Sequence, residues 1–403
     1  MDKKRILIAI GFFLLCVGLG FLIYTFFFKS AITPETPPEI SPTTSTIGAF
    51  PEAGTGGIRP IVTSTTDLPT SGIRPGDQTG GADDTGVRQV VTDSITSAQK
   101  GQNGMRYYNA QDGKFYRLGP DGKPIPLDDT VFFNVQNVNW SPKKDEGIIE
   151  YPDGSNIYYN FETRKQVTLP KHWEEFSFAP GSDKIAAKSI GISNDGNWLI
   201  SASPDGQNVI PIESLGQNGA KVDVNWSPNQ QVIAMARTGD SLGNDQEQVL
   251  FVGQNKENFK SITVEGRGMV SQWSPSGNKL LYSVYSERSE YKPELWIVNA
   301  NPATAGTERK LLNINTWADK CTFQDERYAY CGIPRTLERG AGFVPNIANT
   351  IPDDLYKIDL QTGAKTQIPL EQTHVFQSIF VGEDGETLYF TDKNQSGLFQ
   401  VSP

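Results

Sequence analysis

Trp273-Ser274-Pro275-Ser276-Gly277-Asn278-Lys279-Leu280 is the stretch that decides the fold, because its opening tripeptide returns along the chain. Trp140-Ser141-Pro142 and Trp226-Ser227-Pro228 repeat it, and Phe178-Ala179-Pro180 is a degenerate copy. Each copy is followed by a turn and an apolar run rich in β-forming residues. Intervals of roughly 40 to 50 residues are typical of repeat architectures, and here the repeating units are strands. The sequence therefore predicts a β-propeller.

The residue types of this tripeptide suit the end of an inner strand. Tryptophan supplies a large apolar body that can wedge between neighbouring blades. Proline lacks an N–H, so it fits the point where the hydrogen-bonded ladder stops. Serine, glycine and asparagine then favour a turn. We therefore interpret the tripeptide as structural.

Aligning the turn after each inner strand gives seven units, each predicted to be a blade of four antiparallel strands. The predicted blades cover residues 92–127, 131–169, 173–215, 220–264, 268–312, 316–370 and 374–402. The last unit lacks a strand, and the β-rich segment 87–91 has no other role, so we expect it to pair with residues 398–401. Such pairing removes the unpaired edges of an open sheet. A count of six or eight would require one end unit to be misassigned.

The pattern Trp-Ser-Pro-x-Gly-x-x-Leu at residues 273–280 resembles the TolB-type, WD-like propeller repeat of bacterial envelope proteins. The resemblance covers roughly residues 87–403 and implies a propeller fold, while the motif is weak for function. The Asp usual after the proline is replaced by Lys143, Asn229 and Ser276. TolB itself is a soluble periplasmic protein with an additional N-terminal domain. Because this chain has a predicted anchor instead, the role of TolB is not carried over.

The N-terminal segment predicts a membrane anchor. Residues 6–28 form an uncharged apolar run of 23 residues, enough to cross a hydrocarbon core of ~30 Å as a helix. Residues 1–5 are basic, so the positive-inside rule places them in the cytoplasm and exports the rest from the plasma (inner) membrane. A cleaved signal peptide is the alternative, but its apolar core is normally shorter. Residues 29–86, rich in Pro, Thr, Ser and Gly, are predicted to be a flexible tether.

Charge and cysteine content limit which partners and which cellular compartment the sequence predicts. Residues 31–403 hold 32 Lys and Arg against 45 Asp and Glu, so this part of the chain should repel phosphate backbones, and no nucleic-acid partner is predicted. Cys321 and Cys331 flank a predicted hairpin. In an oxidising exterior they form either a disulfide or two buried thiols, and the spacing leaves both open. No metal site and no cofactor are predicted.

Binding residues are expected on one face of the propeller. The b–c and d–a connections share a face, and the three longest, at 237–247, 285–294 and 333–353, are b–c loops of consecutive blades. They and the nearby d–a loops contribute Arg, Tyr, Trp, Phe and His, and the first three types are enriched at binding hot spots. The alternative is that the tryptophans fill gaps between blades and the arginines are solvated. The candidate residues are His172, Trp173, Arg237, Arg267, Tyr285, Arg288, Tyr291, Trp317, Arg335, Arg339, Phe343 and His374.

These features favour a non-catalytic module that binds an envelope protein or a glycan. The sequence contains no H-E-x-x-H and no P-loop, and its two histidines are about two hundred residues apart. Residues 239–243 match G-x-S-x-G in spacing but fall in the predicted loop 237–247, not in the strand–turn–helix context that a nucleophile elbow needs. One alternative is a propeller enzyme, a glycan hydrolase or lyase with paired carboxylates on the long-loop face. Another is a structural part of an envelope complex. Sequence does not decide among them, because a fold does not fix a function.

Overall fold

The computed structural model describes residues 17–19, 86–240, 242–257 and 259–403. The chain divides into two compact units, residues 1–78 and 79–403. In the first, residues 17–19 form a helical turn. The predicted segments 1–5 and 29–85, and most of 6–28, lie outside the described residues. Within the described part, no helix is both long and apolar enough to cross a membrane.

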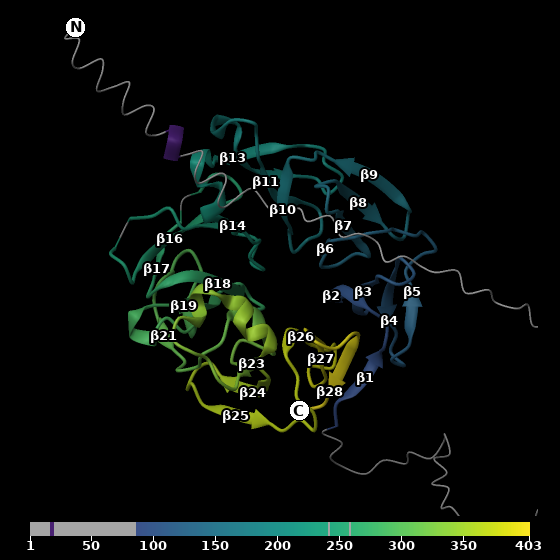
Figure 1. The fold of residues 1–403 in the computed structure, drawn as a ribbon. Coiled ribbons are helices and arrows are strands. Elements are labelled where there is room, and N and C mark those ends of the chain that lie inside the picture. Colours follow the sequence, from purple (N-terminus) through teal and green to yellow (C-terminus); the bar gives the residue numbers. More distant parts are fainter. Residues whose placement is uncertain (1–16, 20–85, 241, 258) are drawn as a thin grey trace, which may run out of the picture. The chain divides into compact units, whose positions relative to one another are not determined.

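The second unit is a ring of seven four-stranded antiparallel sheets, which confirms the predicted seven-bladed propeller (Figure 1). The first three blades, each ordered from the channel outward, are β2 (Ile95–Gly101), β3 (Gly104–Asn109), β4 (Lys114–Leu118), β5 (Pro124–Pro126); β6 (Asn137–Trp140), β7 (Glu146–Glu150), β8 (Asn156–Asn160), β9 (Lys165–Leu169); and β10 (Trp173–Phe178), β11 (Ile185–Ser189), β12 (Trp198–Ala202), β13 (Ile210–Ser214).

Blades 4 to 6 follow the same order of strands. They are β14 (Val222–Val224), β15 (Val232–Ala236), β16 (Glu247–Gly253), β17 (Ile262–Val264); β18 (Arg267–Trp273), β19 (Lys279–Tyr285), β20 (Glu294–Asn299), β21 (Lys310–Leu311); and β22 (Cys321–Phe323), β23 (Tyr328–Pro334), β24 (Asp353–Asp359), β25 (Lys365–Ile368).

Blade 7 joins the two ends of the propeller. It contains β26 (Phe376–Val381), β27 (Leu388–Asp392), β28 (Leu398–Val401) and β1 (Arg88–Val91). β1 comes from the start of the propeller and pairs antiparallel with β28, for example Arg88 opposite Gln400. The ring is thus closed by hydrogen bonds between its first and last strands.

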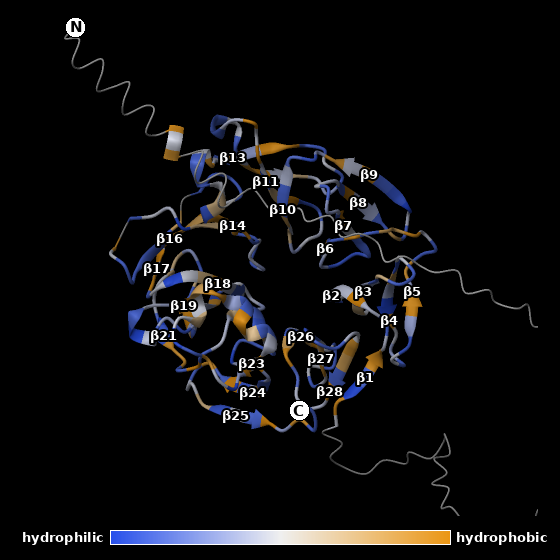
Figure 2. Cartoon of the chain, in the orientation of Figure 1, coloured by the Kyte–Doolittle hydropathy of each residue, from blue (hydrophilic) through white to orange (hydrophobic). Residues whose placement is uncertain are grey.

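The core consists of apolar clusters between neighbouring blades. Seven such clusters of buried side chains occur in the described residues, one for each contact between blades. Figure 2 shows apolar residues on strands around the whole ring, interspersed with polar ones. The repeated tryptophans belong to these clusters: Trp140 lies between blades 1 and 2, Trp226 between 3 and 4, and Trp273 between 4 and 5. The indole N–H of Trp140 also donates to the carbonyl of Ser97 in blade 1 (2.7 Å).

The serine of the tripeptide holds the turn between the first two strands of a blade. In blade 4 the hydroxyl of Ser227 accepts the N–H of Val232 (2.9 Å), and in blade 5 that of Ser274 accepts the N–H of Lys279 (3.1 Å). Both serines are fully buried. The marker tripeptide is therefore a packing and turn element.

Two kinds of connection separate the faces of the ring. Because the strands of a blade alternate in direction, the a–b and c–d connections lie on one face, here called the turn face. The b–c and d–a connections lie on the other, the loop face. Every 3₁₀ helix of the described propeller lies on a loop-face connection: η2 (Asn194–Gly196), η3 (Gly216–Lys221), η4 (Glu287–Ser289), η5 (Ala318–Lys320), η6 (Ala341–Phe343) and η7 (Pro345–Thr350).

Candidate functional site

The longest loop-face connection, residues 335–352 of blade 6, is fixed to the neighbouring connection of blade 5. The N–H of Gly340 donates to the carbonyl of Glu290 (2.9 Å), and the N–H of Gly342 donates to that of Tyr291 (2.8 Å). A Cβ atom at Gly342 would lie 2.5 Å from the ring of Tyr285, so only glycine permits this approach. Two consecutive blades thus share one braced platform.

This platform carries an exposed apolar surface. Phe343 is 58% exposed, Val344 59% and Ile347 36%. We call these three residues the apolar tip. The Phe343 ring lies 4.8 Å from that of Tyr285 and 4.9 Å from that of Tyr291, measured between ring centroids. Aromatic contacts of this kind fix the ring without covering it, so the tip is held in place and still open to solvent.

The tip belongs to a wider bias in the distribution of exposed apolar side chains. In the described propeller, most of the exposed large apolar residues stand on loop-face connections, namely Val131, Phe133, Ile192, Leu242, Phe343, Val344 and Ile347. The others, Ile125, Val209 and Ile210, lie on or beside the outer strands β5 and β13. Contiguous exposed apolar surface on a soluble domain marks an interaction site.

Most of the candidate arginines are already paired within the loop face. Arg288 binds Glu294 and stacks over Trp296. Arg335 binds Asp354 at 2.9 Å.

Two further arginines hold neighbouring connections. Arg237 binds Asp223 at 3.3 Å, and Arg267 donates to the carbonyl of Asn244 at 2.7 Å. By contrast, Arg339 is exposed and makes no ion pair within the described residues. It is therefore the candidate arginine most available to a partner.

Three of the candidate residues are not at the surface. Trp173 is buried in the cluster between blades 2 and 3. Trp317 is buried beneath the long connection with Ala341 and Ala348. His374 is fully buried, its Nδ1 lies 3.0 Å from an Asp392 oxygen, and its ring packs among phenylalanines. These side chains fill space between blades. For the two tryptophans this is the alternative considered above, that they fill gaps between blades instead of binding a partner. His172 is exposed.

Sequence reasoning missed a cavity at the loop-face end of the central channel. Figure 1 shows the inner strands β6, β10, β14 and β18 turned toward the centre of the ring. They line a cavity of about 500 Å³ together with Glu150, at the end of β7. The first strand of each blade begins at the loop face, and the second strand ends there. Because the lining residues stand near these strand ends, the cavity lies at the loop face. Its walls include Phe176, Met235, Met269 and Val270.

Three carboxylates face this cavity, and they are not equally neutralised. Glu175 binds the buried ammonium of Lys188 at 2.5 Å. Asp223 binds Arg237. Glu150 has no ion pair within the described residues and accepts amide N–H groups only, from Asn137 (3.0 Å) and Asn139.

Burial affects the ionisation of these groups. It raises the pKa of Glu150, and the two amide donors offset this only in part. Burial likewise raises the pKa of Asp223, although Arg237 opposes the shift. Perturbed carboxylates in a cavity are a common mark of a functional site. Among the described residues no group of three or more His, Cys, Asp or Glu side chains is arranged to hold a metal ion.

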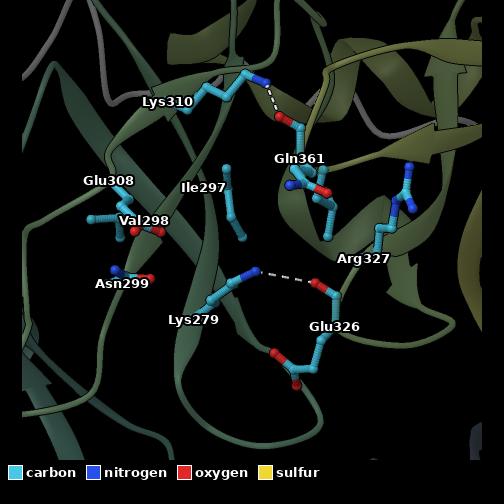
Figure 3. A pocket seen from close by; sticks show the side chains of 10 residues that line it. Lys279, Ile297, Val298, Asn299, Glu308, Lys310, Glu326, Arg327 and Gln361 are labelled. Atoms are coloured by element: carbon cyan, nitrogen blue, oxygen red, sulfur yellow. Dashed lines mark hydrogen bonds between the residues drawn. The ribbon is translucent and has the colours of Figure 1, made fainter.

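A second cavity, of about 450 Å³, lies between blades 5 and 6 on the turn face (Figure 3). Lys279 and Lys310 reach across it to the backbone carbonyls of Glu326 (3.3 Å) and Gln361 (2.6 Å). Arg327 at its edge binds Asp359. The two lysines tie the two blades together, so this cavity is part of the scaffold.

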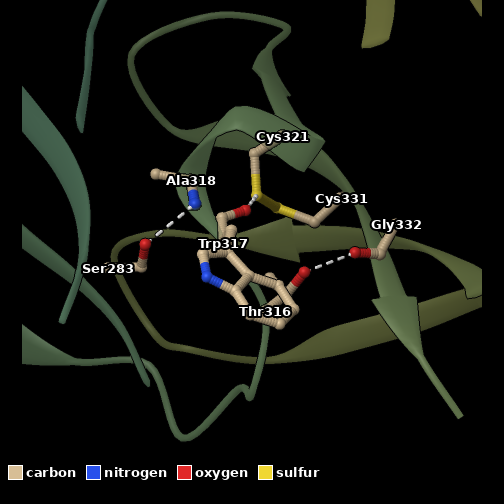
Figure 4. Close-up of a disulfide and its surroundings, with 7 residues drawn as sticks. All are labelled: Ser283, Thr316, Trp317, Ala318, Cys321, Cys331 and Gly332. Carbon is tan, nitrogen blue, oxygen red and sulfur yellow. Dashed lines mark hydrogen bonds between the residues drawn. A yellow bond between two sulfur atoms is a disulfide. The ribbon is translucent and has the colours of Figure 1, made fainter. Parts of the chain in front are cut away.

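A disulfide joins Cys321 to Cys331 in blade 6 (Figure 4). The two residues face each other on the adjacent strands β22 and β23. Both are buried next to Trp317, which supports the long connection from below. Since β23 leads directly into residues 335–352, the bond fixes the base of the apolar tip.

Comparison with known proteins establishes the class of fold. No family model and no curated protein matches the chain. Solved structures do: oligogalacturonate lyase in complex with manganese has a TM-score of 0.56 at 13% identity, covering 78% of this chain and 92% of that one. The β-propeller domain of Swd1 from Myceliophteria thermophila has 0.52 at 10%, covering 79% and 99%. At these identities the likeness shows the fold alone.

TolB from Acinetobacter baumannii also resembles the chain, with a TM-score of 0.43 at 13% identity, covering 71% of this chain and 64% of that one. This score is too low to extend the sequence resemblance to TolB. At identities of 10–13% the neighbours do not decide between binding and catalysis. The chain is a seven-bladed β-propeller.

Proposed function

We propose that this chain is a membrane-tethered, extracytoplasmic propeller that binds a protein of the cell envelope through its loop face. The observation that carries the proposal is the apolar tip, which is exposed and yet braced from two blades. A rigid aromatic anchor loses little entropy on binding, and such anchors supply most of the energy of an interface. Aliphatic Val344 and Ile347 beside Phe343 suit a protein surface better than a glycan.

Export and anchoring rest on two further features. The uncharged run at 6–28 with basic residues before it predicts a single-pass anchor with a cytoplasmic N-terminus. The disulfide between Cys321 and Cys331 supports an oxidising compartment, because cytosolic thiols are kept reduced. Together they favour a propeller held outside the plasma (inner) membrane.

The test is partner capture by the full-length chain in cells that retain their envelope. Phe343→Ser combined with Val344→Ser should lower the yield of a crosslinked partner at least about tenfold, the effect of losing a hot spot. Val209→Ser removes another exposed apolar side chain, 48% exposed and beside β13, and serves as the control. Unchanged capture by the tip variant, with an unchanged melting temperature, would remove the loop face from consideration.

Catalysis remains the second candidate, because the channel cavity gathers Glu150, Glu175 and Asp223. A hydrolase or lyase would use one carboxyl group as an acid and another as a base or nucleophile. Turnover of cell-wall glycan by the wild-type chain, lost in Asp223→Asn, would favour this enzyme over the binding module.

A further inference from the structure

Glu150 has an acceptor that the fold does not use. Its Oε1 accepts both amide N–H groups, from Asn137 and Asn139. Its Oε2 makes no hydrogen bond within the described residues, and it is not among the buried polar atoms that lack a partner. A half-buried carboxylate oxygen of this kind can still accept a strong, charge-assisted hydrogen bond.

The cavity that Glu150 lines has apolar as well as polar walls. Phe176, Met235, Met269 and Val270 contribute to the walls of the cavity of about 500 Å³. Lysine and arginine combine an aliphatic stem with a cationic head, so they bury the stem on apolar surface and present the charge at its end. The other two carboxylates already hold cations, which leaves Glu150 as the unfilled position.

The cavity is also linked through one shared residue to the packing beneath the apolar tip. Val270 lines the cavity and at the same time packs against the cluster of Trp317, Ala341 and Ala348 beneath the tip. A partner seated on the tip therefore lies beside the channel mouth. The acidic balance of residues 31–403 favours a partner with basic side chains.

We propose that this cavity accepts one lysine or arginine side chain of the bound partner, with its cationic head on Glu150 and its stem along Phe176 and the two methionines. The inference rests on the proposed function and names the chemistry of the partner. It makes the loop face a two-part site, an apolar contact at the tip and a cation in the channel.

The chain contains its own reporters for a test. Met235 and Met269 line the cavity, and Met105 is buried in the cluster between blades 7 and 1. We would label the methionine methyl groups of the full-length chain in nanodiscs and titrate Nα-acetyl-lysine methylamide and Nα-acetyl-arginine methylamide. Saturable shifts of Met235 and Met269, with Met105 unmoved, are expected at millimolar concentrations. The neutral Nα-acetyl-norleucine methylamide should bind at least about tenfold more weakly.

Variants show whether Glu150 is responsible for binding the cationic probes. Glu150→Gln keeps an oxygen for the two asparagines and removes the charge, so affinity should fall about tenfold or more. Glu162→Gln, an exposed carboxylate of the same blade on the turn face, should change nothing. If Glu150→Gln fails to fold, Ser271→Lys places an ammonium group in the cavity and should abolish probe binding. Equal binding of the norleucine probe, or full binding by Glu150→Gln, overturns the inference.

A last experiment distinguishes binding of a partner's side chain from binding of a free amine. Cadaverine carries an ammonium group like that of lysine at each end of a free aliphatic stem. If cadaverine binds and both blocked amino acids do not, the cavity takes a small amine and the inference is wrong. If the tip variants lose partner capture while the methionine signals never move, the proposed function stands and the inference alone fails.

Discussion

The two faces of this propeller are built from the same strands and differ in what joins them. On the turn face, blades 4 and 5 share one arrangement, in which a buried serine hydroxyl accepts an N–H of the next strand and the marker tryptophan fills the gap between blades. On the loop face, each connection is different, all the described 3₁₀ helices occur, and exposed apolar residues gather. The turn face therefore contributes to the packing between blades, and the loop face can differ from blade to blade.

The largest effect should come from the residue that the repeat conserves. Trp273→Ala removes a buried body between blades 4 and 5 and should lower the free energy of unfolding by about 3–5 kcal/mol. Phe343→Ala on the loop face should cost less than about 1 kcal/mol, since that side chain is already exposed. Denaturant unfolding of the full-length chain, followed by circular dichroism, measures both. Equal losses would mean that the faces do not divide stability and binding as described.

The disulfide should have the next largest effect. Replacing both Cys321 and Cys331 by Ala should lower the free energy of unfolding by about 2–3 kcal/mol, because the bond closes a loop of ten residues in the unfolded chain. The same denaturant experiment measures it, and thiol labelling after denaturation without reductant shows whether the bond forms. One reactive thiol, that of Cys16, is expected in the wild-type protein, and three would show that the bond does not form.

Two equivalent turns allow a smaller and sharper comparison. Gly277 in blade 5 has φ of 72°, and Gln230 at the same place in blade 4 has φ of 64°. Gly277→Ala should destabilise the fold by about 1–2 kcal/mol, because a Cβ there would lie 2.7 Å from the backbone nitrogen of Asn229. Gln230→Gly should instead be neutral or stabilising by up to about 1 kcal/mol. Thermal unfolding of both variants measures these changes. If Gly277→Ala stabilised the protein, the turns of blades 4 and 5 would not be equivalent.

The smallest effect concerns pH. Burial raises the pKa of Glu150 in the folded state, so its contribution to stability is fullest below the unfolded pKa and is lost as pH rises through the folded value. Glu150→Gln should therefore raise the melting temperature at pH 8, by no more than about 2 °C, and the difference should disappear near pH 4. Thermal scans at both pH values, with Glu162→Gln as control, test this. A variant less stable than wild type at pH 8 would be contrary to it.

The propeller could be predicted because its signal is local and repeated. Trp140, Trp226 and Trp273 each mark the end of an inner strand within a few residues of the turn that they precede. In blades 4 and 5 the fourth residue after the marker tryptophan adopts a left-handed backbone conformation, and where it is not glycine, as at Gln230, the sequence gives no signal of this, because the turn imposes a conformation that the residue type does not favour.

The site was harder to predict because separate blades assemble it. Glu150, Glu175 and Asp223 come from three blades and form no local motif. Whether a tryptophan on or directly after a d–a connection points outward depends on the next blade, so Trp173 and Trp317 could not be told from surface residues by position alone. Phe343, which lies in the apolar tip, was among the predicted candidates, since long loops on a scaffold tend to carry function.

Site-specific photo-crosslinking in intact cells tests most directly whether the loop face binds the partner. A benzoylphenylalanine would replace Phe343 on the loop face or Glu162 on the turn face, each in the full-length chain. The account predicts one discrete crosslinked species from position 343, reduced by Glu150→Gln, and none from position 162. A species from position 162 with none from position 343 would contradict it.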